Sequence, residues 1–64
     1  MIVKLKCVDN TDKYDCESGF ITTGKCYTGL MSNDNEFAVI DDTGDLITDC
    51  VIDPYYGKWE IVNE

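Results

Sequence analysis

The side chains in this sequence that could carry chemistry are carboxylates and thiols. Its 64 residues include 13 Asp and Glu, four Cys and five Lys, with neither His nor Arg. General acid–base or nucleophilic catalysis needs a base held against a nucleophile, or two carboxylates in one pocket. The only adjacent carboxylates are Asp41 and Asp42, and neighbouring residues of a strand point to opposite faces. We therefore interpret both as turn residues whose carboxylates accept hydrogen bonds from nearby backbone amides. We do not expect this protein to be an enzyme.

A bound metal or cofactor is not expected either. Asp41, Thr43 and Asp45 partly reproduce the spacing of a calcium loop, but the distant bidentate Glu is missing. Zinc sites need clustered Cys or His, and the chain has no His and no C-x-x-C pair. The cysteines fall at wide, irregular spacings, at Cys7, Cys16, Cys26 and Cys50.

The surroundings of the cysteines follow from the segments that contain them. The first residues do not resemble a signal peptide, and disulfides are disfavoured in the reducing cytosol, although four Cys would allow two. Cys7, Cys26 and Cys50 lie in apolar segments and should be buried as small hydrophobic side chains. Cys16 lies in a polar segment and should be exposed, where its acidic neighbours disfavour a reactive thiolate.

Charge is the strongest compositional signal. A formal net charge of -8 repels nucleic-acid backbones and anionic lipids, so direct binding to nucleic acid or to a membrane is disfavoured. No apolar stretch approaches the roughly 20 residues that span a bilayer. The same charge would speed association with a basic surface, including the DNA- or RNA-binding groove of another protein. The simpler interpretation is that the acidic residues keep a small domain soluble.

Five short strands are predicted to position these residues. Residues 2–8 alternate between apolar and polar with the period-2 pattern of a half-buried strand. Further strands are predicted at residues 25–31, 36–40, 46–52 and 59–62, with Gly29 marking a bulge or sharp bend. A chain of this length can form one core, so residues 1–64 are predicted to be a single domain.

The connections between the strands are predicted from their turn residues. Residues 9–19 form a long acidic loop, and residues 32–35 and 41–45 form turns. Pro54 interrupts the fourth strand, because proline cannot donate to a sheet, and residues 53–57 are expected to form one helical turn. Together these elements predict an all-β fold, a small five-stranded SH3-like barrel with one short helical turn before the last strand.

Large rings are too numerous for so small a core. Some of them should be exposed, whereas Trp59 and one tyrosine of the Tyr55–Tyr56 pair are expected to cap the core. Stacked rings beside acidic loops also resemble a groove for a proline-rich peptide. The rings that exceed the core's capacity are Tyr14, Phe20, Tyr27, Tyr55, Tyr56 and Trp59, and the groove-like set among them is Tyr14, Tyr55, Tyr56 and Trp59.

Four segments, taken in order, resemble the pattern of small uncharacterised bacteriophage and prophage proteins. They are KCVDN at residues 6–10, ITTGKCY at 21–27, FAVIDDTG at 37–44 and WEIV at 59–62. The resemblance spans nearly the whole chain and implies a phage source and an SH3-like barrel. The matching residues look like turn and core positions and imply no chemistry. The acidic loop at residues 9–17 and the extra cysteines depart from the pattern.

The first functional hypothesis is a small acidic phage protein that inhibits or modulates a host protein in the cytoplasm of the host bacterium. The target would be a nucleic-acid-handling enzyme or an anti-phage defence effector with a basic surface, and carboxylates would stand in for phosphates. Exposed rings would anchor the interface centre. The predicted partner-binding residues are Asp12, Asp15, Glu17, Asp41, Asp42 and Asp45, with Tyr14 and Tyr56 as the anchors.

Two other hypotheses remain open. A self-associating assembly or accessory module of a phage complex is the main alternative, because a short chain with a small core often gains stability by forming a homo-oligomer. The third is direct nucleic-acid binding through a basic face, which would consist of Lys4, Lys6, Lys25 and Lys58.

Overall fold

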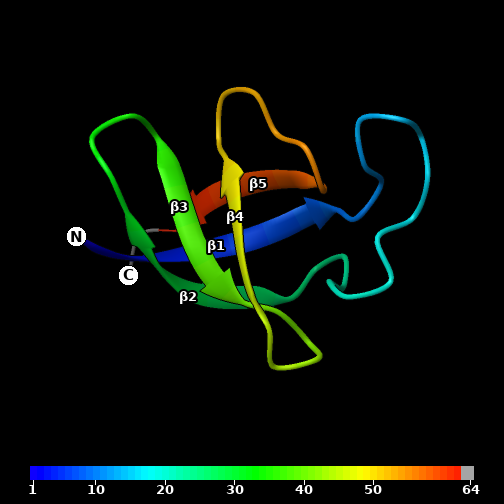
Figure 1. Ribbon diagram of the computed structural model, residues 1–64, viewed down its shortest axis with the longest axis horizontal. Coiled ribbons are helices and arrows are strands. Elements are labelled where there is room, and N and C mark those ends of the chain that lie inside the picture. Colours follow the sequence, from blue (N-terminus) through cyan, green and yellow to red (C-terminus); the bar gives the residue numbers. More distant parts are fainter. Residues whose placement is uncertain (63–64) are drawn as a thin grey trace.

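In the computed structural model, which describes residues 1–62, the chain forms one curled antiparallel sheet (Figure 1). The strands are β1 (Ile2–Asp9), β2 (Cys26–Met31), β3 (Glu36–Ile40), β4 (Leu46–Cys50) and β5 (Lys58–Val62). They lie in the order β4-β3-β2-β1-β5, so β5 pairs with the edge of β1 that faces away from β2. This arrangement confirms the predicted all-β fold of a small SH3-like barrel. Within residues 1–62 no helix has the length and hydropathy that crossing a membrane requires.

β2 joins the two halves of the sheet. It pairs with β1 from Cys26 to Leu30 and with β3 from Gly29 to Met31. A Cβ atom at Gly29 would lie 2.5 Å from the Ala38 carbonyl oxygen, so only glycine lets the two strands approach this closely. Pairing is regular through Gly29, and the register shift that marks a bulge lies between β1 and β5 instead.

The core fills the inner side of the curled sheet. Alternation along β1 turns Leu5 and Cys7 inward and Lys4 and Lys6 outward, as predicted. Trp59 is buried, which confirms the prediction that it caps the core. The rings of Tyr27 and Phe37 meet it edge to face, with centroids 5.8 and 5.0 Å away. The buried apolar side chains are Leu5, Cys7, Ile21, Tyr27, Met31, Phe37, Val39 and Trp59.

The cysteines, all with free thiols, only partly follow the prediction. Cys7 is buried and Cys16 is exposed, as expected, and burial raises the pKa of the Cys7 thiol. Cys26 is exposed and Cys50 is only half-buried, so the prediction that both are buried is wrong. The reason is strand alternation, since Tyr27 takes the inward position and leaves Cys26 on the outer side.

The connection between β4 and β5 forms a series of bends, so the predicted helical turn at residues 53–57 is wrong. The buried Asp49 carboxylate accepts hydrogen bonds from the N–H groups of Tyr55, at 2.7 Å, and Tyr56, at 3.0 Å. It also accepts one from the indole Nε1–H of Trp59, at 2.7 Å. In a helical turn, these backbone amides would donate to carbonyl groups three residues earlier. Here they donate to the Asp49 carboxylate, around which the segment bends. β4 accordingly ends at Cys50, earlier than predicted.

Candidate functional site

The long loop between β1 and β2 is folded into a hairpin. Thr11 and Glu17 form an isolated β-bridge, and the tip lies between them. The Asp12 carboxylate accepts hydrogen bonds from the N–H groups of Tyr14, at 2.8 Å, and Cys16, at 3.0 Å. Asp15 occupies the left-handed region with φ 64°, which Asp tolerates in tight turns. Some acidic residues of this loop therefore shape its tip.

The loop tip packs on the connection between β4 and β5. The Lys13 N–H donates to the Tyr55 carbonyl at 3.0 Å. The Tyr14 ring, 65% exposed, meets the Tyr55 ring edge to face at a centroid distance of 6.0 Å. Tyr55 contacts Tyr56 at 4.9 Å, and Tyr56 contacts Phe20 at 5.2 Å. These four rings, Tyr14, Tyr55, Tyr56 and Phe20, form a continuous aromatic row across two loops that are far apart in the sequence.

The aromatic row already holds a cation. The Lys13 ammonium lies 5.0 Å from the Tyr55 ring centroid and 5.7 Å from that of Tyr14, within the range of cation–π attraction. The neighbouring Tyr14 phenol raises the pKa of Tyr55, because the two hydroxyls would repel each other if ionised. Tyr55 thus stays neutral and offers its ring face to positive charge.

Two shallow grooves lie on either side of Tyr56. The acidic residues that line the first, of about 320 Å³, are Glu36, Asp49 and Asp53, and those that line the second, of about 460 Å³, are Asp41 and Asp45. In the part of the chain that the structure describes, no lysine lines either groove. A segment bound across Tyr56 would therefore meet negative charge on both sides.

Most of the predicted site residues are brought to this region. Tyr14 and Tyr56 belong to the aromatic row, and Tyr56 also packs against the core, as expected for one tyrosine of its pair. Asp45 is exposed in the second groove. Of the five others, Asp12, Asp15 and Glu17 lie in or beside the loop tip that carries Tyr14.

Asp41 lines the second groove beside Asp45, but its carboxylate is engaged within the β3–β4 turn. Its buried carboxylate accepts hydrogen bonds from the Thr43 hydroxyl at 2.6 Å, the Thr43 N–H at 2.9 Å and the Asp45 N–H at 3.0 Å. These bonds lower the pKa of Asp41, and the bond from the Thr43 hydroxyl contributes most. Asp41 is thus the turn residue that the sequence also suggested. Among residues 1–62, no three side chains of the kinds that bind metals lie together as a cation site.

Asp42 is engaged within the chain as well. Its carboxylate accepts hydrogen bonds from the hydroxyls of Thr22, at 2.6 Å, and Tyr27, at 2.9 Å, and forms an ion pair with Lys25 at 2.6 Å. Lys25 and the two hydroxyls hold the pKa of Asp42 at about 2. Asp42 therefore fastens the β3–β4 turn to the end of the long loop.

Four residues of the surface were not among the predicted ones: Phe20, Tyr55, Glu36 and Asp53. The sequence signal that came closest to indicating the aromatic row was the adjacent pair Tyr55–Tyr56, which directly follows Pro54. Glu36 begins β3, and Asp53 lies in the β4–β5 connection. The turn before β3 approaches that connection where the Val51 N–H donates to the Asn35 carbonyl at 3.0 Å. That approach is not visible in the sequence.

Comparison with known proteins gives no relative for this chain. No family model, no curated protein and no solved structure matches it. The aromatic row and the two acidic grooves are therefore the features from which we infer a function.

Proposed function

We propose that this protein is a binding module that captures a basic segment of another protein across its aromatic row. The observation that carries this proposal is the Lys13 ammonium, which lies over the Tyr55 and Tyr14 rings. It occupies the place that a lysine or arginine of a partner would take. The acidic grooves beside Tyr56 supply a second reason for a positively charged partner.

The biological role that we propose is inhibition or modulation of a host protein by a phage-encoded binder in the host cytoplasm. A nucleic-acid-handling enzyme or a defence effector presents a basic groove, and carboxylates can occupy it in place of phosphates. The exposed carboxylates of this surface that would do so are Asp15, Glu17, Glu36, Asp45 and Asp53. The net charge of -8 favours rapid, salt-sensitive association with such a groove.

Direct nucleic-acid binding has less support. Lys25 is paired with Asp42, and Lys6 lies opposite Glu60 in the β1–β5 register. Acidic residues thus lie next to two of the four lysines that a basic face would need.

The test uses ¹⁵N-labelled protein and a Lys/Arg-rich peptide, with an equally long Glu-rich peptide as the control. We expect the basic peptide to shift the amide signals of Lys13, Tyr55 and Tyr56, and the shifts to shrink at high salt. A Tyr14→Ala/Tyr55→Ala variant should lose at least about tenfold in affinity, because two ring contacts with the cation are removed.

The matched control is Ile52→Ser, since Ile52 is 75% exposed but contributes no ring to the row. If both peptides shift the same signals, or if the ring variant binds as well as the control, the proposal is wrong.

A further inference from the structure

The curled sheet leaves β4 and β5 as its edge strands. Within residues 1–62, β4 pairs only with β3 and β5 pairs only with β1, so each has one side without a partner strand. An edge strand presents backbone N–H and C=O groups that can pair with a strand of another chain. The surroundings of the two edges decide what each of them can bind.

Alternate residues of β4 direct their backbone groups to the free edge. In an antiparallel pair, the backbone groups of every second residue point to the partner strand. At one end of the β3–β4 pair, the Asp41 N–H donates to the Asp45 carbonyl at 2.9 Å, and at the other the Val51 N–H donates to the Asn35 carbonyl at 3.0 Å. The register between these bonds is continuous, so the odd-numbered residues of β4 bond to β3. The residues whose backbone groups point to the free edge are Leu46, Thr48 and Cys50.

Two of these three residues are open to an added strand. The Cys50 N–H already donates to the Asp49 carboxylate at 2.8 Å. Within residues 1–62, Leu46 and Thr48 take part in no hydrogen bond outside the strand pairing. Each of them therefore offers one backbone donor and one backbone acceptor at the free edge.

The free edge of β4 runs along both grooves beside Tyr56. Leu46 and Ile47 line the second groove, and Thr48 and Cys50 line the first. A chain segment that follows this edge therefore passes both grooves and the acidic residues that line them. No lysine among residues 1–62 lines either groove, so the charge along this edge suits a basic segment.

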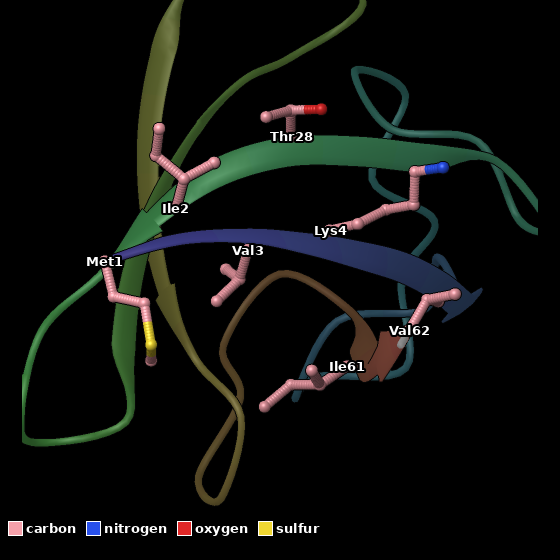
Figure 2. Close-up of a pocket in the computed structure, with 7 residues that line it drawn as sticks. All are labelled: Met1, Ile2, Val3, Lys4, Thr28, Ile61 and Val62. Carbon is pink, nitrogen blue, oxygen red and sulfur yellow. The ribbon is translucent and has the colours of Figure 1, made fainter. Parts of the chain in front are cut away.

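The other edge strand has different surroundings. Ile61 and Val62 of β5 line a hollow of about 500 Å³ (Figure 2). Its lining includes Lys4 and, in the part of the chain that the structure describes, no carboxylate. A basic segment thus finds complementary charge along β4 and not at this hollow. A second copy is disfavoured on β4 as well, because it would bring its own acidic grooves and a net charge of -8.

We propose that the basic segment of the partner binds along the free edge of β4 as an added, extended strand. This inference rests on the proposed function and gives the conformation of the segment and the backbone groups that hold it. Leu46 and Thr48 exchange hydrogen bonds with alternate residues of the segment, as in other cases of strand addition. Tyr55 lines the first groove, so a lysine or arginine at that end of the segment reaches the aromatic row. The segment has no proline at its paired positions, because proline lacks the N–H that pairing needs.

Amide hydrogen exchange tests the geometry. In the free protein, we expect the amides of Leu46 and Thr48 to exchange at least about tenfold faster than those of Ile47 and Asp49, which bond to β3. A short peptide of alternating lysine and threonine, at about ten times its Kd, should slow the first two amides about tenfold. A peptide that shifts the Tyr55 signal without slowing them overturns strand addition and leaves the proposed function standing. Protection that rises with protein concentration and needs no peptide would assign the edge to a second copy, and so overturn the proposal.

Methylated peptides test the hydrogen bonds without a change to the protein. One version carries N-methyl groups on the backbone of its lysines and the other on that of its threonines, and only one set of N–H groups can point to β4. We expect one version to lose at least about tenfold in affinity and the other to bind like the unmodified peptide. Equal affinities of the two versions overturn the added strand. Failure of the unmodified peptide to bind overturns the proposed function as well.

Thr48→Pro tests the same bonds from the side of the protein. It removes one N–H from the free edge, where proline is tolerated because that group does not bond to β3. We expect about tenfold weaker binding of the unmodified peptide, whereas the matched control Thr48→Val keeps the N–H and should bind like the wild type. Circular dichroism checks the fold of both variants. A folded Thr48→Pro that binds as tightly as Thr48→Val overturns the proposal.

Discussion

Asp49 is predicted to hold the β4–β5 connection and, with it, half of the aromatic row. One carboxylate oxygen accepts from the amides of Cys50 and Tyr55, at 2.8 and 2.7 Å. The other accepts from the Tyr56 amide and the Trp59 indole, at 3.0 and 2.7 Å. Asp49→Ala removes all four acceptor contacts at a buried position.

The cost of that substitution follows from the donors that it leaves behind. A buried donor without a partner costs about 1–3 kcal/mol. The Trp59 indole is enclosed, whereas water can reach part of the connection near exposed Tyr55. We therefore expect Asp49→Ala to lose about 3–5 kcal/mol of the free energy of unfolding. A domain of this size has only about 3–10 kcal/mol in total, so the variant should be close to unfolded.

Asp49→Asn refines the test, because one oxygen stays an acceptor while the new amide group faces two donors. We expect it to fall between the wild type and Asp49→Ala. The assay is urea unfolding followed by circular dichroism, with Asp53→Ala as the control, since Asp53 is exposed in the same connection and should change stability by less than about 0.5 kcal/mol. A loss below about 1 kcal/mol for Asp49→Ala would refute the reasoning.

Three further predictions concern the barrel. Gly29→Ala should destabilise the fold by at least about 2 kcal/mol in urea unfolding, because its Cβ would meet the Ala38 carbonyl at 2.5 Å, whereas Gly19→Ala, with nothing within 4 Å, should change it little. The pKa of Asp42 is lowered from 3.8 to about 2, so its contribution to stability is present above 3.8 and disappears as pH falls through about 2. Asp42→Asn should therefore flatten the dependence of unfolding free energy on pH in that window, and an unchanged slope would contradict this. Exposed Cys26 should react with a thiol reagent in the native protein, whereas buried Cys7 should react only at the rate of unfolding; equal rates would argue against the described burial.

Local sequence patterns were sufficient to predict the strands. Period-2 alternation in β1 fixed which residues face the core, and turn residues separated all five strands to within two residues at each end. The same patterns predicted that Trp59 is buried and that some rings are exposed, as Tyr14 is. These properties depend on neighbours only a few positions away in the chain.

The helical turn, the cysteines and the site depended on contacts that local patterns do not encode. Residues 53–57 have helix-turn composition, but Asp49 takes their amides from outside the segment. Cys26 lies in an apolar run, but the register that turns Tyr27 inward turns it outward. Asp42 looks like an exposed acid until the long loop brings Thr22 and Lys25 to it.

The sequence alone predicts a five-stranded acidic barrel with more rings than its core can enclose. Four of those rings form one row only because the folded chain brings two loops together, with Tyr14 and Phe20 from one loop and Tyr55 and Tyr56 from the other. The tertiary structure likewise places the outer aliphatic residues of four strands on one face. Alternation fixes the side of a strand on which a residue lies, but the packing of distant segments fixes which residues become its neighbours.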